Sequence, residues 1–385
     1  MRSCLSVSWV LAAVAGCHVA GIDYTGKSCP CPGGYTCDET TDTCTRAIDD
    51  AGPTDIAVDT TLDTPLDDGC YGTGLVRACP SPGWPDMVSL SGSIGTTTSP
   101  LCVPAQLPNA CVIVANHIVI PAAVTLSGRG TRPLVLVGVQ SIDVVGTIDV
   151  GSHHNLGSVG AGGNSASCEA AVPPAGIAGG AGGSFAGKGG TGGQGNGANG
   201  GIAPAGVALT ELRGGCPGED GGGTGAGTGG RGGGAVYLIS PGSITIAGTI
   251  DASGEGGVGA TVADVGGGGG GTGGLIGLDC PSLTIMNSAA LFANGGGGSA
   301  GAGATPPAND GADALVVTTA AAGGVGDPTS NNRTGGAGSV NTTYDGAAGH
   351  ASAGSGGGGG GGGAAGYVKL YPMQVVGGAI SPPPS

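Results

Sequence analysis

Short runs that alternate apolar and polar residues recur along the chain and are separated by turn-forming residues. Four segments share a layout of three such runs: 134–136, 142–144 and 146–149; 236–238, 244–246 and 248–251; 276–278, 283–285 and 290–294; and 368–370, 375–376 and 380. In the first two copies the second run begins 8 residues after the first. Pro241, Pro281 and Pro372 follow the first run in three copies, and proline suits a corner better than a strand interior.

Short strands that turn at regular corners are typical of a parallel β-helix. A single rung cannot bury its own apolar row, whereas stacked rungs bury it and also pair their backbone groups. A β-sandwich is the alternative, but it requires longer strands and hairpin turns. We therefore predict an all-β fold with a parallel β-helix (solenoid-like) over residues 113–380. Ile142, Ile244, Leu283 and Val375 are expected to form one buried row.

Glycine-rich excursions interrupt the predicted rungs at about residues 153–231, 254–274 and 295–363. In the first excursion glycine or alanine occupies every third position from Gly180 to Gly201. Such a period suits polyglycine II helices, since a threefold extended helix places every third residue on one side, where only small residues allow close packing. The alternative is a flexible linker, which we favour for much of the tracts and expect for the eight glycines 356–363. The excursions are thus predicted to be partly disordered or polyglycine II.

The first 17 residues have the features of a bacterial export signal. Arg2 precedes an apolar run at 5–15, which is too short to span a bilayer but suits a signal peptide. Val14-Ala15-Gly16-Cys17 resembles the lipobox of bacterial lipoproteins, and this resemblance implies cleavage of residues 1–16 and lipidation of Cys17. An ordinary secretory signal is the alternative. Residues 17–27 would then form an N-terminal tether.

Thirteen cysteines indicate an oxidising compartment. The disulfide candidates are Cys29, Cys31, Cys37 and Cys44 in a small module at 28–45, Cys70, Cys79, Cys102 and Cys111 in a cap at 70–112, and Cys168 and Cys216 in the first excursion. The pairing among the first four stays open, because four cysteines allow three connectivities. We expect Cys168 to pair with Cys216, and Cys280 to remain a buried thiol.

The net charge of −15 is concentrated in the N-terminal part of the chain. Residues 46–69 are rich in Asp, Thr and Pro and predict an extended acidic linker, while residues 381–385 form a proline-rich tail. Nucleic acid is excluded as a partner, since its recognition requires clustered Lys and Arg.

Candidate chemistry is confined to one predicted corner. Asp149 with His153 or His154 suggests an acid/base pair, and Asp251 occupies the place of Asp149 in the next copy. We interpret these residues as solvent-facing turn residues, because no second acid is seen to pair with Asp149. The sequence therefore predicts no catalytic residue, no metal site and no cofactor.

The export signal, cysteine module, acidic spacer and interrupted repeat together resemble glycine-rich cell-envelope lipoproteins of the myxobacterial type. The pieces that carry this resemblance are 132–138, 146–154 and 178–185. It implies no established activity. We expect a non-enzymatic envelope lipoprotein with a structural, adhesive or surface-display role, outside the cytoplasm at the outer membrane or cell surface. Its partners would be the membrane, through the lipid anchor, and an envelope polysaccharide or another surface protein. A β-helix polysaccharide lyase or hydrolase and an ice or surface binder are the alternatives.

Overall fold

The computed structural model describes residues 27–28, 35–38, 40, 42–46, 69–315, 317–326, 332–373 and 377–385. These residues belong to two compact units, Met1–Leu66 and Asp67–Ser385. In the first unit, β1 (Tyr35–Asp38) and β2 (Thr43–Arg46) pair antiparallel, with Cys37 opposite Cys44. Cys37 is disulfide-bonded, as expected of this module. Cys17, Cys29, Cys31 and most of the predicted signal, tether and acidic linker lie outside the described residues.

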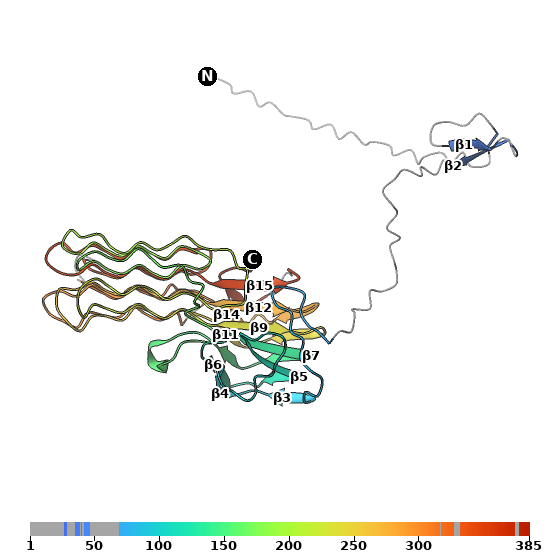
Figure 1. Cartoon of the computed structure of the whole chain (residues 1–385), viewed down its shortest axis with the longest axis horizontal. Coiled ribbons are helices and arrows are strands. Elements are labelled where there is room, and N and C mark those ends of the chain that lie inside the picture. Colours follow the sequence, from blue (N-terminus) through green and yellow to red (C-terminus); the bar gives the residue numbers. More distant parts are fainter. Residues whose placement is uncertain are drawn as a thin grey trace, which may run out of the picture. The chain divides into compact units, whose positions relative to one another are not determined.

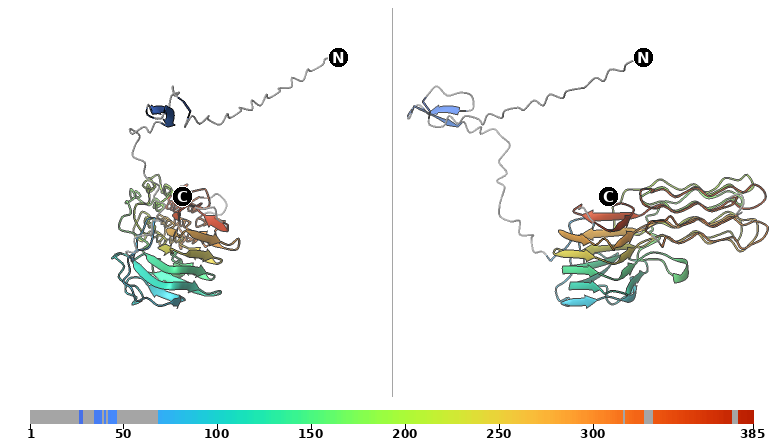
Figure 2. Two further views of the ribbon diagram at one scale, coloured as in Figure 1. Left: turned by 90° about the vertical axis from the view of Figure 1, so that its right-hand side faces the viewer. Right: turned by 180° about the vertical axis from the view of Figure 1, so that it is seen from behind.

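The second unit contains a parallel β-helix, which confirms the predicted fold class (Figure 1). Its six successive rungs are β3 (Met87–Ser89) with β4 (Gly92–Gly95); β5 (Cys111–Ile120) with β6 (Thr125–Arg129); β7 (Leu134–Val144) with β8 (Thr147–Asp149); β9 (Ala235–Ile239), β10 (Ser243–Ile246) and β11 (Thr249–Asp251); β12 (Leu275–Asp279), β13 (Ser282–Ile285) and β14 (Ala290–Phe292); and β15 (Tyr367–Tyr371) with β16 (Ala379–Ser381). The strand pairs between rungs are parallel and form an eight-stranded and a six-stranded sheet. Figure 2 shows the rungs stacked in chain order.

The predicted row is formed. Ile142, Ile244 and Leu283 are register partners on adjacent strands of the larger sheet. Ile142 and Ile244 are fully buried in the main core, whereas Leu283 is half-buried and packs against it. Val375 lies outside the described residues. A matching row in the smaller sheet contains Ile148, Ile250 and Leu291, each fully buried. Each such side chain stabilises the stack by about 1.5–3 kcal/mol relative to an exposed one.

The corner between the first two runs of a repeat is formed only in the later copies. β7 continues through this point as a single strand and therefore pairs with both β9 and β10. In the next two copies Pro241 and Pro281 follow the first strand, and the chain divides there into two strands. Proline has no N–H for the ladder, which explains the difference.

Only part of the predicted cap 70–112 packs on the outer face of the larger sheet, because β3 and β4, within that range, form the first rung. Val76 and Ala78, within the loop closed by the Cys70–Cys79 disulfide, pack in a second core cluster with Val112, Val135 and Tyr237. Asp279 fixes the same loop, since its carboxylate accepts hydrogen bonds from the N–H and hydroxyl of Thr73 at 2.7 and 2.8 Å.

In their described residues the three excursions form a hydrogen-bonded bundle, so the expectation of flexible linkers was wrong there. They leave after β8, β11 and β14 and return at β9, β12 and β15, and Figure 1 shows them side by side as a bundle of extended segments. Their backbone hydrogen bonds repeat every third residue: Gly180 and Gly183 donate to Gly267 and Gly270. A threefold repeat of bonds between extended segments defines a polyglycine II arrangement.

The run of eight glycines at 356–363, expected to be a linker, is instead a central rod of this bundle. Three consecutive N–H groups, of Gly360, Gly361 and Gly362, donate to three different segments. The acceptors are Ser299, Gly180 and Ala347, while Gly336, Gly270 and Gly190 donate to the carbonyls of the same three glycines from three further segments. Six neighbouring segments therefore surround the run, and its glycines are buried.

A second run, 266–274, is enclosed in the same way. Its neighbours are the segments that contain Glu219, Glu255, Gly230, Gly183, Gly296 and Gly361. A Cβ atom on Gly268 or Gly360 would lie 2.0 or 1.9 Å from a carbonyl oxygen of a neighbouring rod. Gly357 to Gly363 have no φ in the left-handed range, so close packing, and not backbone conformation, requires glycine here.

Peripheral rods carry side chains on one side only. Along 188–194, Lys188 and Gln194 are exposed and Thr191 is half-buried, while Gly189, Gly190 and Gly193 between them are buried. This outward spacing explains the three-residue period of the sequence. Within the described residues, no helix is both long and apolar enough to cross a membrane.

Candidate functional site

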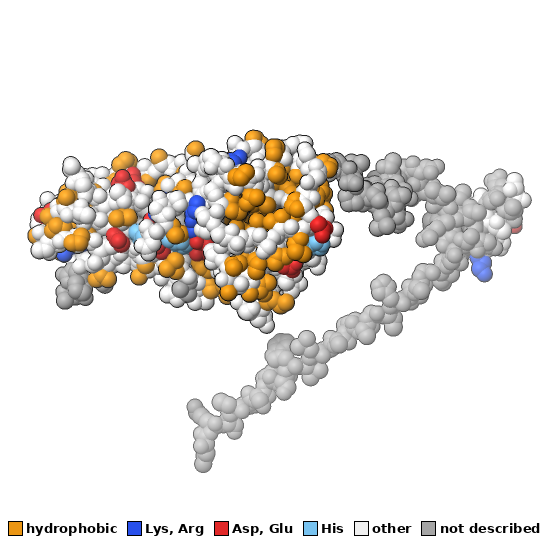
Figure 3. All heavy atoms as spheres, turned by 90° about the horizontal axis from the view of Figure 1, so that it is seen from below, with side chains coloured by type: hydrophobic (Ala, Val, Ile, Leu, Met, Phe, Trp, Pro, Cys, Tyr) orange, Lys and Arg blue, Asp and Glu red, His pale blue; other side chains and the backbone are white. Residues whose placement is uncertain are grey.

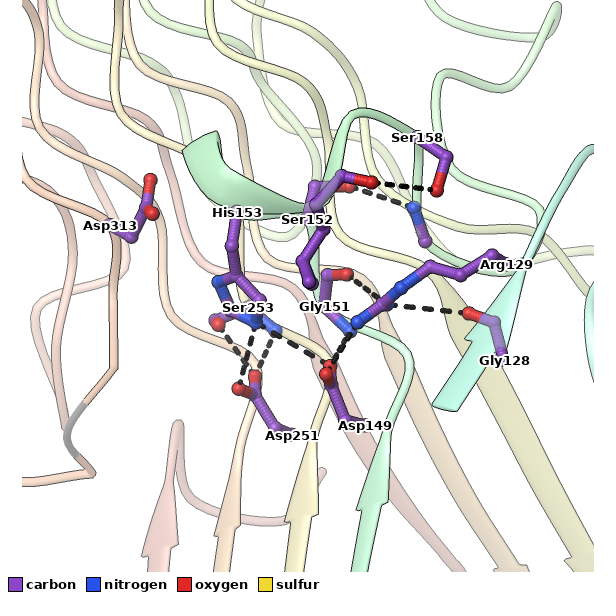
Figure 4. Close-up of polar contacts among 12 residues, drawn as sticks. Gly128, Arg129, Asp149, Gly151, Ser152, His153, Ser158, Asp251, Ser253 and Asp313 are labelled. Atoms are coloured by element: carbon purple, nitrogen blue, oxygen red, sulfur yellow. Dashed lines mark hydrogen bonds and ion pairs between the residues drawn. The ribbon is translucent and has the colours of Figure 1, made fainter. Parts of the chain in front are cut away.

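A charged cluster lies where the six-stranded sheet meets the bundle. Asp149 ends β8 and Asp251 ends β11, and the two are register partners on neighbouring rungs. His153 follows in the turn before the short 3-10 helix η1 (His154–Leu156), and Arg129 ends β6. Figure 4 shows Arg129, Asp149 and Asp251 near the ends of their strands, with His153 pointing from the turn toward the two aspartates.

His153 bridges the two carboxylates. Its Nε2 lies 3.4 Å from Oδ1 of Asp149 and 3.3 Å from Oδ2 of Asp251. Arg129 donates to the other oxygen of Asp149 and, at 2.5 Å, to the carbonyl of Gly151. The other carboxylate oxygen of Asp251, Oδ1, accepts a hydrogen bond from the N–H of Ser253 at 2.8 Å. Each charged group of the cluster therefore has an oppositely charged partner.

The protonation of His153 follows from these contacts. Burial opposes its charged form, but the hydrogen bonds to Asp149 and Asp251 outweigh burial and raise its pKa to about 10. Burial would raise the pKa of Asp149, but His153 and Arg129 together hold that pKa below its usual value. At neutral pH the cluster thus contains an imidazolium and a guanidinium against two carboxylates.

Two further ion pairs extend the cluster into the other excursions. His154 Nδ1 lies 2.7 Å from Oδ1 of Asp313, which comes from the third excursion. Arg231, at the end of the first excursion, pairs with Glu255 of the second excursion. Arg231 also donates a hydrogen bond to the carbonyl of His153 at 3.1 Å. The charged residues therefore tie the bases of all three excursions to one another.

The donor set of Asp149, His153 and Asp251 is compact. The three donor atoms lie within 4.8 Å of one another, and oxygen with imidazole ligands is a common combination for divalent metals. In this arrangement His153 bridges the two carboxylates and the Arg129 guanidinium pairs with Asp149, so each donor group already has a protein partner.

The cluster is mostly buried. The side chains of Arg129, Asp149, His153 and Asp251 are only 9–17% exposed. Through these ion pairs the cluster ties the ends of β6, β8 and β11 to the turn that contains His153.

Two interpretations made from the sequence were wrong here. His153 and Asp251 are buried rather than solvent-facing, and Asp251 is the second acid that pairs with Asp149. The sequence contained a signal for this pairing, because aligning the repeats places Asp149 and Asp251 at the same position of adjacent rungs. Arg129 was missed, since it lies two residues beyond the register partner of Asp149 and outside any repeated motif.

The cysteines in the second unit pair as the candidates suggested. Disulfides join Cys70 to Cys79, Cys102 to Cys111, and Cys168 to Cys216. Cys280 is a buried thiol, and burial raises its pKa to about 11. Disulfides persist in oxidising surroundings, so the protein is extracytoplasmic.

The second unit is a parallel β-helix that carries a polyglycine II bundle, and the charged cluster lies where the two meet. The chain matches no known protein family, no curated protein and no solved structure.

Proposed function

We propose that this protein is a lipid-anchored envelope protein with a structural or adhesive display role. The observation that carries this proposal is the pair of glycine rods, each enclosed by six hydrogen-bonded segments. Ordering glycine costs more backbone entropy than ordering any other residue, and a simple loop would not require it. The arrangement instead supplies a closely hydrogen-bonded bundle, and its peripheral rods, such as 188–194, present side chains to the outside.

The N-terminal sequence supplies the anchor in this proposal. Lipidated Cys17 would hold the chain at the membrane, and several acyl chains on one cysteine anchor firmly where one does not. The acidic linker 46–69 would then separate the bundle from the membrane surface. The extracytoplasmic disulfides agree with this location.

The outer surface suits a weakly charged partner. Charged residues make up 10% of the chain, and Figure 3 shows few of them among many uncharged and apolar side chains on one face. An envelope polysaccharide or another surface protein fits such a surface better than nucleic acid does. The enzymatic alternative has less support, because the cluster of Arg129, Asp149, His153 and Asp251 is mostly buried and internally paired.

Metabolic labelling of a bacterial host with an alkyne fatty acid tests the anchor. The wild type and a Cys4→Ala control should incorporate label and fractionate with membranes, since Cys4 leaves with the signal. Cys17→Ala should lose the label and become soluble. Protease treatment of intact cells should cleave the wild type if it is displayed at the surface. Equal labelling of wild type and Cys17→Ala would contradict the proposal.

A further inference from the structure

One buried arginine of the second unit is not fully paired. Arg213 is 7% exposed, and its guanidinium carbon lies 4.3 Å from the centroid of the Phe185 ring. Its Nη1 donates to the Sγ atoms of Cys168 and Cys216, each at 3.4 Å. Disulfide sulfur is a weak acceptor, so these contacts position the guanidinium without neutralising it.

The charge of Arg213 has one distant counter-ion. Oε1 of Glu211 lies 3.8 Å from Nε, beyond hydrogen-bond distance, and the Glu211 side chain is 52% exposed. Among the described residues, Glu211 is the only acid with a carboxylate oxygen within 4.0 Å of this guanidinium. Arg129 and Arg231, by contrast, each donate directly to a carboxylate. Arg213 is therefore a largely desolvated cation that retains capacity for an anion.

Arg213 also lines a cleft of about 380 Å³. The polar side chains on its walls are Asn109, Thr131, Asn164, Ser165, Ser167 and Glu211. Asn109, Thr131 and Ser167 are exposed, so their amide and hydroxyl groups are accessible to a ligand. Small-molecule sites have volumes of about 300–1,000 Å³, and this cleft lies at the lower end of that range.

We propose that this cleft binds the carboxylate of an acidic saccharide unit, with Arg213 as its anchor. A planar guanidinium can donate two parallel hydrogen bonds to a carboxylate, and the surrounding hydroxyl and amide groups can form hydrogen bonds with sugar hydroxyls. The net charge of the chain is −15, which opposes long polyanions and favours a short or sparsely charged saccharide. This inference rests on the proposed function, for which it identifies the class of polysaccharide partner.

Calorimetric titration of the full chain, with its disulfides intact, tests this site with D-glucuronate, D-glucose and acetate as probes. Glucuronate should bind, and glucose should bind far more weakly because it has no carboxylate. Arg213→Lys should weaken glucuronate binding about tenfold or more, since a charge-assisted bidentate contact is lost. Glu211→Gln should strengthen binding several-fold, because it removes the competing carboxylate. Arg132→Lys is the matched control and should bind as wild type, since Arg132 lines a different cleft and donates to the backbone of Thr96 and Thr97.

Three results would overturn the inference. The first is no glucuronate binding by the wild type, and the second is unchanged affinity in both Arg213→Lys and Glu211→Gln. The third is acetate binding as tight as glucuronate, which would indicate a site for any small anion and not for a saccharide. If Arg213→Lys unfolds, Glu211→Gln decides. Fatty-acid labelling of Cys17 is independent of all these results, so failure here leaves the proposed anchor standing.

Discussion

Replacing Gly360 by alanine tests the enclosed rod at a single atom. The added Cβ would lie 1.9 Å from the carbonyl oxygen and 2.4 Å from the carbonyl carbon of Gly268. Gly268 belongs to the other central rod, which is itself surrounded and buried. Neither backbone can therefore move away without breaking hydrogen bonds to further segments.

The expected loss is about 1–3 kcal/mol or more for overpacking, set against a gain of about 0.4–1 kcal/mol from the stiffer unfolded chain. Gly354→Ala is the matched control in the same excursion. Gly354 is exposed, its Cβ would meet nothing within 4 Å, and its φ is not in the left-handed range. This control should be neutral or slightly stabilising through the unfolded-state effect alone.

Urea unfolding of wild type, Gly360→Ala and Gly354→Ala, followed by circular dichroism with disulfides intact, gives the comparison. The free energy of unfolding of the two variants should differ by about 2 kcal/mol or more, with Gly360→Ala the less stable. If Gly360→Ala were as stable as Gly354→Ala, the enclosed rod would be refuted.

Three other predictions concern the solenoid, the charged cluster and the excursion base. Ile244→Asp should destabilise by about 4 kcal/mol or more and prevent recovery of folded protein, because it buries an unpaired charge in the core row. Thr284→Asp, at an exposed position of β13 opposite the uncharged Thr245, is the control and should fold normally. The pKa of His153 is raised to about 10 in the folded protein, so protonated His153 stabilises the fold fully below its unfolded pKa of about 6.5, and this contribution is lost as the pH rises to about 10. The melting temperature of the wild type should therefore fall across that pH interval, and that of His153→Gln should change less. The double variant Cys168→Ser, Cys216→Ser opens a loop of sequence separation 48 and should lower the free energy of unfolding by about 2–5 kcal/mol. Non-reducing mass spectra should show the other disulfides intact. An unchanged midpoint of urea unfolding would refute the role of this bridge.

The rungs could be predicted because their signal is local. Alternating residues in the runs at 142–144 and 244–246 define which side chains point inward, and Pro241 and Pro281 mark corners through the absence of an N–H. Joining of the first two runs within β7 was not predicted, since nothing at Val139 and Gln140 forbids or requires a corner. The outcome depends on how β7 pairs with its neighbours.

The bundle and the charged sites depend on contacts that the sequence does not display. Glycine at every third position indicates a rod that packs on one side. An uninterrupted glycine run such as 356–363 instead belongs to a rod with neighbours on all sides, but from the sequence this run was interpreted as a flexible linker. Asp149 and Asp251 lie about 100 residues apart and meet only because the excursions return to the same edge of the solenoid. The incomplete pairing of Arg213 likewise depends on the packing of Phe185 and a disulfide.

The central claim is that the glycine runs are interior rods, and hydrogen exchange of their amides tests it most directly. Peptides covering 266–274 and 356–363 should exchange as slowly as peptides from β9 and β12. The glycines of both runs are buried, and N–H groups along each run donate to carbonyl groups of neighbouring rods. Peptides around the exposed Gly354 turn provide the fast-exchanging reference. If the 356–363 amides exchanged as fast as that turn under native conditions, the run would be a linker and the bundle described here would be contradicted.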